Sequence, residues 1–575
     1  MKRLWVYLRP YRAQCVLGPI FKLLEAILEL LLPTVMALVI NNGVERRDSR
    51  YVLWMGGLMA AMALVGFGCS CVCQYSAAKA SQGFGTRLRD DVFRRVLGFS
   101  YQELDRFGPA TLTNRLTSDI NQLQLAVAMF IRLVIRAPFI CIGAIAMAMI
   151  LDLKLAQILL AAVPLFVLVL YLIVRASSPL YARYQRQLDR LAALVRENLS
   201  GVRVIRAFAR RDHEEARFAG ANGELNRTAN RVGRISALLS PVTAAIMNGV
   251  ILLVLWTGGR RIQLGSFTQG ETIAFINYVT QILLALVVVS NLVVIFTRAF
   301  ASAGRINELL AVIPAIADGP GAQPDPAAAA VEFQDVSFAY SATGDLALEH
   351  ISFAAGRGER VGIIGPTGSG KSTLVQLIGR HYDATGGSVR VMGADVRQYA
   401  LRQLRGLVAI APQRGALFAG TVADNLRLGR PEATEAELEQ AARTAQALEF
   451  IQALPQGFAA PVARGGQNFS GGQRQRLSIA RALAARPQIL ILDDSASALD
   501  FATEAALRRA LARDAGETTV FIVTQRAGSI RDCDRILVLD DGQLVGMGAH
   551  RELLHNCPAY REICLSQMSA EEAEA

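Results

Sequence analysis

Long apolar runs alternate with polar stretches over the first half of the chain. Three of the connections between runs are short, whereas those at 79–129 and 176–237 are long and keep helical periodicity. An even number of runs leaves both ends of the region on one side of a membrane. The pattern predicts an all-α membrane domain of six helices that extend well into the cytoplasm. The six runs, each long enough to cross a bilayer of about 30 Å, cover residues 13–42, 52–78, 130–151, 155–175, 238–258 and 272–297.

The pattern changes beyond residue 310. Residues 311–330 are rich in Pro, Ala and Gly and lack a periodic apolar face, which is typical of a linker. From residue 331, short β-rich runs alternate with helical segments, the pattern of a parallel sheet with crossover helices. We therefore predict a membrane domain at 1–310, a linker at 311–330 and an α/β domain at 331–575.

The composition of the chain supports a division into a membrane part and a water-soluble part. Of the 575 residues, 52% are apolar and 19% are charged, against roughly 25% charged in an average soluble protein. The net charge of +12 comes largely from stretches at 85–136 and 174–235, which are flanked by apolar runs. Basic residues on the cytoplasmic side of a membrane protein produce this distribution. Because these residues do not gather beside stacking aromatic side chains, we expect no nucleic-acid partner.

Several polar residues lie inside the predicted spans. Lys22, Glu25 and Glu29 share one face of the first span, which should therefore look into the bundle or a wet cavity. Two interpretations are open: an internal Lys22–Glu25 ion pair with Glu29 near the water boundary, or a contact with substrate or a proton. In the last two spans we favour hydrogen bonds between helices over substrate contacts. The candidate cavity residues are Glu25, Glu29, Asn248, Asn277, Gln281 and Asn291.

A glycine-rich motif follows the apolar run VGII in the α/β region. Glycines let backbone N–H groups approach a chain of phosphates, Lys371 neutralises its charge and Ser372 can ligate magnesium. Asp493, at the end of the apolar run ILIL, is placed to hold the same ion. The motif therefore predicts a nucleotide and Mg²⁺ as ligands. It fits the pattern G-x-x-x-x-G-K-[ST] and consists of Gly365, Pro366, Thr367, Gly368, Ser369, Gly370, Lys371, Ser372 and Thr373.

Further motifs identify a family. With FSGGQ at 469–473, SALD at 497–500 and Gln413 in APQ, the chain resembles an ATP-binding cassette (ABC) transporter. Six spans ahead of one cassette resemble a half-transporter of the exporter fold. The resemblance implies a P-loop nucleotide-binding domain, and residues 108–120 and 197–211 look like the loops that couple the spans to it.

The resemblance assigns a role to each motif. Tyr340 looks like the aromatic residue that stacks on adenine, and Gln413 like the glutamine that senses magnesium and the attacking water. Asp493 looks like the metal carboxylate, so the implied metal set is Ser372, Gln413 and Asp493. Asp500 belongs to the D-loop. The signature that caps the ATP of a partner subunit comprises Ser470, Gly471, Gly472 and Gln473.

Two catalytic positions depart from the family pattern. The residue after the metal aspartate is usually a glutamate that acts as general base, but here it is Asp494, whose carboxylate is one methylene shorter. Loss of a general base typically costs about 10²- to 10⁴-fold in rate. The switch histidine is replaced by Gln525, which cannot carry a positive charge. Arg464 also stands where many exporters have an acidic residue.

The two departures resemble the degenerate half of a heterodimeric exporter. The resemblance implies that this chain binds ATP but hydrolyses it slowly, while its intact signature completes the active site of a second, non-identical half-transporter. The expected function is export of amphipathic drugs or lipids from a bacterial cell membrane, with both termini and the nucleotide-binding domain cytoplasmic. Two alternatives are an exporter-fold importer of metal chelates and an ATP-gated regulatory or channel subunit.

Overall fold

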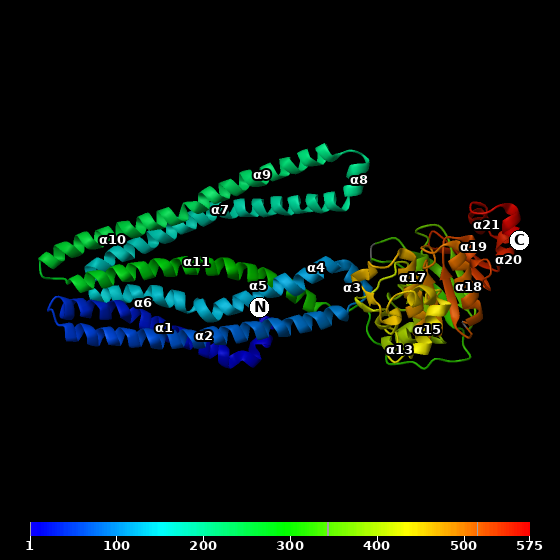
Figure 1. Cartoon of the computed structure of the whole chain (residues 1–575), viewed down its shortest axis with the longest axis horizontal. Coiled ribbons are helices and arrows are strands. Elements are labelled where there is room, and N and C mark those ends of the chain that lie inside the picture. The colour runs from blue at the N-terminus through cyan, green and yellow to red at the C-terminus, as the bar shows by residue number, and fades with distance from the viewer. Residues whose placement is uncertain (1, 342–343, 515, 575) are drawn as a thin grey trace. The chain divides into compact units, whose positions relative to one another are not determined.

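The chain folds into two compact units, one helical and one α/β (Figure 1). The computed structural model describes residues 2–341, 344–514 and 516–574. The first unit comprises Met1–Val96 and Pro109–Val312, and the second comprises Leu97–Gly108 and Ile313–Ala575. The predicted fold class, a six-helix membrane domain followed by an α/β nucleotide-binding domain, is confirmed.

The first unit consists almost entirely of helices. In the described part of the chain, six helical runs are long and apolar enough to cross a membrane, as predicted. Three of the segments are short π-helical turns, η2, η3 and η4, inside these runs. The elements are η1 (Lys2–Tyr11), α1 (Arg12–Leu38), η2 (Val39–Val44), α2 (Ser49–Leu97), α4 (Pro109–Asn114), η3 (Arg115–Asp119), α5 (Ile120–Met129), η4 (Phe130–Val134), α6 (Arg136–Leu151), α7 (Leu153–Ser200), α8 (Val202–Ala207), α9 (Arg211–Ala237), α10 (Leu239–Gln263) and α11 (Gln269–Ala311).

Side-chain caps set where the long helices begin. Asp152 separates α6 from α7 and accepts a hydrogen bond from the Leu155 backbone N–H (2.8 Å). Thr268 begins α11 through a capping box with Glu271, whose carboxylate accepts from the Thr268 N–H at 2.8 Å. Such caps satisfy N–H groups that have no partner inside the helix. Short polar connections therefore suffice to reverse the chain between these spans.

The second unit contains a mostly parallel six-stranded sheet and an antiparallel four-stranded sheet. The strand order is β12-β11-β3-β10-β9-β6 in the first and β2-β1-β4-β5 in the second, and β7 and β8 form a separate pair. Asp541 and Gly542 form the hairpin turn between β11 and β12, because Asp540 pairs with Gln543. The strands are β1 (Val331–Phe338), β2 (Leu348–Ala355), β3 (Arg360–Ile364), β4 (Gly386–Val391), β5 (Ala394–Asp395), β6 (Val408–Ala411), β7 (Gly420–Thr421), β8 (Pro461–Val462), β9 (Ile489–Asp493), β10 (Thr519–Val523), β11 (Arg535–Asp540) and β12 (Gln543–Gly548).

Helices pack around these sheets. The central strands are apolar on both faces: all five residues of β9 are buried, as the pattern of a covered parallel sheet requires. The helices are α3 (Tyr101–Phe107), α12 (Lys371–Ile378), η5 (Val396–Gln398), α13 (Leu401–Leu407), α14 (Val422–Leu426), α15 (Glu435–Thr444), α16 (Leu448–Gln452), η6 (Gly457–Ala459), η7 (Arg464–Gly466), α17 (Gly471–Ala484), α18 (Phe501–Asp514), α19 (Ala527–Ile530), α20 (His550–Asn556), α21 (Pro558–Leu565) and α22 (Ala570–Glu574).

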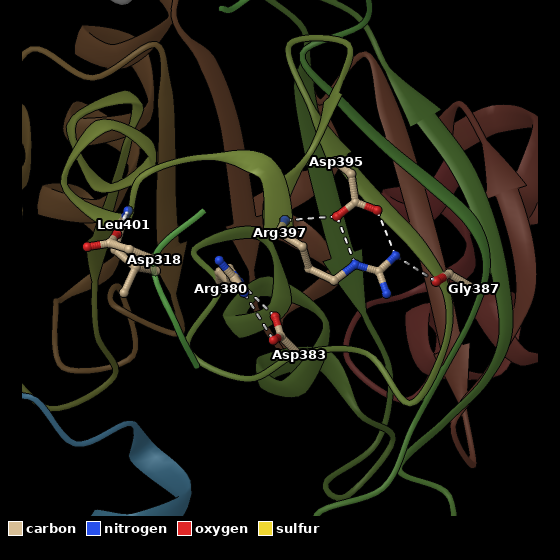
Figure 2. A network of polar contacts seen from close by, with 7 residues as sticks. All are labelled: Asp318, Arg380, Asp383, Gly387, Asp395, Arg397 and Leu401. Atoms are coloured by element: carbon tan, nitrogen blue, oxygen red, sulfur yellow. Dashed lines mark hydrogen bonds and ion pairs between the residues drawn. The ribbon is translucent and has the colours of Figure 1, made fainter. Parts of the chain in front are cut away.

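The Pro-rich segment ahead of β1 is held against the second unit by polar contacts. The N–H groups of Gly319 and Gly321 donate to the carbonyls of Tyr399 and Gln398, both at 3.0 Å. The carboxylate of Asp318 accepts from the N–H of Leu401 at 2.6 Å. Figure 2 shows this contact beside the neighbouring Arg–Asp pairs of the same region. The segment therefore lacks regular structure but has defined partners.

Candidate functional site

Four adjacent parallel strands bring the predicted site residues to one edge of the sheet. In the order β3, β10, β9, β6, Val523 of β10 pairs with Ile363 of β3 and with Asp493 of β9. Leu492 of β9 pairs with Ala411 of β6. The strands therefore end level with one another, and each is followed by a predicted site residue or motif. Ligands bind at this carboxyl edge in open α/β sheets.

The phosphate loop lies between β3 and α12, and its glycines are required by the backbone. A Cβ atom at Gly365 would lie 2.0 Å from the carbonyl oxygen of Leu539. Gly370 has a φ of +92°, and a Cβ there would lie 2.6 Å from the carbonyl oxygen of Ala347. Pro366, Thr367 and Gly368 form the exposed crest of the loop. The backbone is thus free of side chains where it would cradle phosphates.

Lys371 is folded against the phosphate loop. Its Nζ donates to the carbonyls of Gly365 (2.9 Å) and Pro366 (2.6 Å) and lies 3.4 Å from the hydroxyl of Ser369. Burial lowers the pKa of Lys371, while the carboxylates of Asp494 and Asp493 act in the opposite direction. The ammonium group is therefore fixed at the base of the loop, where it could neutralise β and γ phosphates.

Ser372 and Asp493 form a pair of oxygen ligands that fits magnesium. The Ser372 hydroxyl donates to Asp493 Oδ1 at 2.8 Å, and Asp493 is only 7% exposed. Burial raises the pKa of Asp493, with the charge of Asp494 adding to this effect and the Ser372 hydrogen bond opposing it. A hard divalent cation favours such a carboxylate and hydroxyl, and its charge would offset the cost of burying the carboxylate.

Gln413 and Asp494 contact each other across the ends of β6 and β9. The Gln413 Nε2 donates to Asp494 Oδ2 at 3.0 Å. Asp494 has a φ of +45°, in a region that non-glycine residues seldom adopt and that often marks functional sites. The short carboxylate is therefore held by the amide of Gln413. The role of Asp494 as a base and the role of Gln413 as a metal ligand stay predictions.

Gln525 lies two residues beyond β10 with an exposed side chain. Its backbone carbonyl accepts from Gln567 Nε2 at 2.7 Å, and Gln567 Oε1 accepts from the N–H of Ala527 at 2.9 Å. Gln567 therefore braces the loop that carries the switch position. Sequence reasoning missed Gln567, because it follows the last strand by many residues and belongs to no motif.

Tyr340 lies beside the phosphate loop. Its hydroxyl is 2.8 Å from the Thr373 hydroxyl, and its ring meets Phe338 and Tyr382 edge to face, with centroids 4.9 and 5.3 Å apart. The residue is 48% exposed. These contacts fix the ring while part of it stays open, as stacking on a flat base requires. Adenine stacking by Tyr340 stays a prediction.

The signature residues begin helix α17. The Ser470 hydroxyl accepts from the N–H of Gln473 (3.2 Å), and Gln473 Oε1 accepts from the N–H of Ser470 (2.9 Å). A Cβ at Gly471 would meet nothing within 4 Å, whereas one at Gly472 would lie 3.3 Å from the carbonyl oxygen of Ala498. The helix N-terminus is thus uncovered at Gly471. Among the described residues, no hydrogen bond joins the signature to the phosphate loop of the same chain.

Asp500 caps helix α18. Its carboxylate accepts from the N–H of Thr503 at 2.9 Å and from the Thr503 hydroxyl at 2.8 Å. The backbone hydrogen bond, followed by that of the hydroxyl, lowers the pKa of Asp500. The D-loop aspartate therefore has a structural role as a helix cap in addition to the role that the resemblance implies.

Helix α3, just upstream of the predicted coupling segment at 108–120, packs against the rest of the second unit. Tyr382 donates its hydroxyl to Asp105 (2.7 Å), and the ring of Tyr101 stacks on His381 with centroids 4.6 Å apart. Glu103, which caps α3, accepts from the N–H of Ala315 at 3.0 Å. Residues 97–108 therefore group with the second unit, whereas Pro109 onward belongs to the first.

The polar residues of the spans form several kinds of contact. Lys22 donates to Glu25 at 2.7 Å, which confirms the ion pair, and Glu29 pairs with Arg136 at 2.6 Å. Gln281 donates to the backbone of Glu29 at 3.4 Å, a contact between helices.

In the last two spans, Asn277 does not form the expected hydrogen bond between helices. Its amide bonds Ile273 in its own helix at 2.9 Å, because the side chain is exposed and meets no polar group of another helix. Asn248 and Asn291 are also exposed, and no hydrogen bond within the described residues involves their side chains. Contact of any of these residues with substrate stays a prediction.

Comparison with known proteins places the chain in a family. Residues 15–286 match the ABC transporter transmembrane region, and residues 348–497 match the ABC transporter ATP-binding model. An uncharacterized ABC transporter ATP-binding protein of Mycobacterium tuberculosis is 39% identical over 98% of this chain and 97% of its own. One of Bacillus subtilis is 36% identical over the full length of both.

Two further similarities concern relatives with more specific names. A fatty acid ABC transporter ATP-binding/permease protein of Mycobacterium tuberculosis is 34% identical over 83% of this chain and 75% of its own. A solved bacterial Atm1-family ABC exporter with ATP bound shares the fold, with a TM-score of 0.79, 25% identity and coverage of 96% of this chain and 97% of that one. This chain therefore belongs to the ABC transporter family, as an exporter-fold half-transporter in which one membrane domain is fused to one ATP-binding domain.

Proposed function

We propose that this half-transporter is the slow-site subunit of a heterodimeric exporter of amphipathic small molecules. Its own Lys371 site would bind ATP with Mg²⁺ and hydrolyse it slowly. Its signature, Ser470 to Gln473, would complete the faster site of a second, non-identical subunit. The observation that carries this proposal is Asp494 in the place of the usual catalytic glutamate.

The geometry around Asp494 supports a slow site. A general base must come within hydrogen-bond reach of the proton that it removes. The Asp494 carboxylate is one methylene shorter than that of glutamate, and one of its oxygens accepts from Gln413 at 3.0 Å. Gln525, in the place of the switch histidine, offers an exposed amide that carries no positive charge. Both changes weaken the activation of water and leave the phosphate and metal ligands intact.

The signature supports a role in a partner's site. Ser470 and Gln473 hold the first turn of α17 rigid, and Gly471 keeps its N-terminus uncovered. Uncovered backbone N–H groups at a helix N-terminus favour an anion such as a γ-phosphate. Since this signature is intact while residues 494 and 525 are changed, the two active sites of the dimer would differ. We expect the partner to carry the usual glutamate and histidine.

Two observations favour an amphipathic substrate. The spans expose many apolar side chains together with isolated polar ones such as Asn277. A relative is named as a fatty acid transporter. Both points favour an amphipathic cargo, exported across a bacterial plasma membrane with the ATP-binding domain on the cytoplasmic side.

Restoring the glutamate tests the slow-site proposal. In a complex whose partner site has been disabled by removing its catalytic base, Asp494→Glu should raise ATP hydrolysis at least about tenfold, because the carboxylate regains its reach. Asp500→Glu, a matched extension of a nearby aspartate that caps α18, should give no gain. An Asp494→Glu complex as slow as its parent would contradict the proposal.

A further inference from the structure

An apolar pocket lies in the first unit beneath η1. Every side chain that lines it is apolar or aromatic, and Trp5 meets Phe130 edge to face with centroids 6.1 Å apart. The segment η1 combines exposed arginines with apolar and aromatic residues, which is typical of a segment that lies at the membrane surface. With a volume of about 70 Å³, the pocket has room for part of the acyl chain of an amphiphile. Its lining includes Leu4, Trp5 and Leu8 of η1, Cys15 of α1, and Phe130 and Ile131 of η4.

Charged side chains gather close to this pocket. Two cations are neutralised: Lys22 by Glu25 at 2.7 Å and Arg136 by Glu29 at 2.6 Å. Cys73 of α2 packs in one apolar cluster with Ile131, the neighbour of Arg132, and a Cβ at Gly18, one turn before Lys22 in α1, would lie against both. The group therefore contains three cations and two carboxylates.

Arg132 carries the surplus positive charge. It is half-buried, its Nε is buried without a hydrogen-bond partner, and no carboxylate among the described residues forms an ion pair with it. Both nearby carboxylates are already bound to other cations. An uncompensated charge inside a membrane domain is costly, and such residues mark sites of function. An anion would compensate the charge of Arg132.

The π-helical turn η4 joins the pocket to this surplus charge. Phe130 and Ile131 line the pocket, and Arg132 follows them directly in the same turn. Gly18 brings α1 close at this point, because a Cβ there would lie 2.5 Å from Ile131 Cγ2. Single π-helical turns are rare and often occur at functional sites. Apolar and cationic groups are thus placed next to each other.

We infer that this corner of the membrane domain binds an anionic amphiphile, with its apolar chain in the pocket and its carboxylate or phosphate at Arg132. The ligand is either the transported substrate or a resident anionic lipid, which share this chemistry. Its identification as substrate rests on the proposed export function, whereas binding itself does not. If the ligand is the substrate, the amphipathic molecule that the transporter exports is an acid.

Trp5 offers a direct reporter of binding. The other two tryptophans, Trp54 and Trp256, are 76% and 70% exposed and can be replaced by phenylalanine. The assembled complex, with a second subunit that carries no tryptophan, is placed in nanodiscs of neutral phosphatidylcholine. It is titrated with doxyl-stearate, at a pH where the acid is ionised, or with its methyl ester. We expect the acid to quench Trp5 at about tenfold lower concentration, the effect of one charged hydrogen bond.

Substitutions test whether the preference for the acid over the ester depends on Arg132. Arg132→Gln should abolish the advantage of the acid and leave the curve of the ester unchanged, which also shows that the pocket is folded. Arg132→Lys should retain most of the advantage, and Arg260→Gln, at an exposed arginine of α10, should retain all of it. Equal quenching by acid and ester in the parent, or an advantage that survives Arg132→Gln, would overturn the inference.

Two further experiments distinguish a resident lipid from a transported substrate as the source of the anion. If phosphatidylglycerol in the nanodisc suppresses quenching by the acid, and the complex does not move stearate in vesicles, the ligand is a resident lipid. If ATP drives stearate across vesicles and Arg132→Gln weakens this transport, the ligand is the substrate. The quenching titration needs no hydrolysis, so it stays informative even if the two ATP sites prove to be equivalent.

Discussion

A single methylene separates Asp494 from the glutamate that the family usually has at this position, and the surroundings of Asp494 show why that difference matters. The carboxylate is tied to Gln413 at 3.0 Å on a backbone with a φ of +45°. Lys371, Ser372 and Asp493 nearby keep the contacts that phosphate and metal binding need. On this proposal, ATP binding and hydrolysis depend on different residues, and hydrolysis can be lost while binding is kept.

The local motifs of this site could be predicted from the sequence, whereas several of its supports could not. The phosphate loop is contiguous in the chain, so its glycines and Lys371 can be recognised from their spacing in the sequence alone. Glu103 contacts Ala315, Asp105 contacts Tyr382 and Gln567 contacts Gln525, all across long stretches of chain. Such pairs depend on tertiary packing and leave no periodic signal in one sequence.

His381 makes the contact with α3 sensitive to pH. Burial, assisted by the charge of Arg405, lowers the pKa of His381 to about 4, and its Nδ1 is buried without a hydrogen bond in the described structure. The unfolded chain, with a pKa near 6.5, binds the proton more tightly than the folded chain. Stability is therefore full above about pH 6.5 and is lost as the pH falls toward 4, by up to about 3 kcal/mol.

Thermal unfolding of the second unit between pH 7 and 4 checks this expectation. The unfolding midpoint of the parent should fall more steeply with acidity than that of His381→Gln. Parallel curves for the two proteins would show that His381 remains protonated in the folded state or is exposed. His555, an exposed histidine of α20, provides the control substitution His555→Gln.

At the scale of elements, the long helices include the predicted apolar runs and extend beyond them. The six predicted spans lie within helical runs such as Ser49–Leu97 and Leu153–Ser200, which continue far beyond the apolar stretches. Polar periodicity predicted these extensions. The π-helical turns at 39–44, 115–119 and 130–134 had no sequence signal, because an extra residue in a helical turn is chosen by tertiary packing.

One phenol contributes a hydrogen bond to the contact between α3 and the rest of the second unit. Burial, together with the hydrogen bond to Asp105, raises the pKa of Tyr382 well above its usual range, so the hydroxyl stays a donor. Tyr382→Phe removes a hydrogen bond to a charged acceptor, which is typically worth about 1.5–3 kcal/mol. We expect substrate-stimulated ATPase activity to fall several-fold while basal activity is retained.

Tyr399 supplies a matched control for this prediction. Its buried hydroxyl donates to the carbonyl of Val391 at 2.8 Å, wholly inside the cassette. Tyr399→Phe should lower the thermal stability and leave the ratio of stimulated to basal activity unchanged. If Tyr382→Phe keeps a normal ratio, the hydrogen bond to Asp105 has no part in coupling.

Helix α11 is clamped to η3 by a buried carboxylate. Asp119 is 2% exposed and accepts from Arg305 Nε (2.9 Å) and from the Ser302 hydroxyl (3.0 Å). Asp119→Asn leaves Arg305 without its partner, and because that arginine is half-exposed we expect a loss of about 1–3 kcal/mol in stability.

An exposed ion pair is the reference for this loss. Arg211 and Glu215 lie 2.6 Å apart on the surface of α9, with side chains 82% and 61% exposed, so Glu215→Gln should cost less stability than Asp119→Asn. Thermal unfolding of the intact complex in detergent ranks the two substitutions. Equal destabilisation by both would mean that the Asp119 network contributes no more than a surface pair.

At the scale of the whole molecule, we propose that the chain supplies parts of two different sites. Its phosphate loop and metal ligands meet at one sheet edge, while its signature begins a separate helix that forms no hydrogen bond with that loop among the described residues. An ABC half-transporter of this kind needs a second subunit to complete each site. If the two subunits differ in their catalytic residues, only one site drives the cycle at full rate.

The unequal roles of the two ATP sites are the central claim, and one comparison tests it most directly. ATP hydrolysis by the assembled complex is measured after Asp494→Asn and, separately, after the corresponding substitution of the partner's catalytic base. We predict that Asp494→Asn retains most of the activity, whereas the partner substitution lowers it by about 10²- to 10⁴-fold. Near-complete loss of ATPase activity from both substitutions would contradict the account.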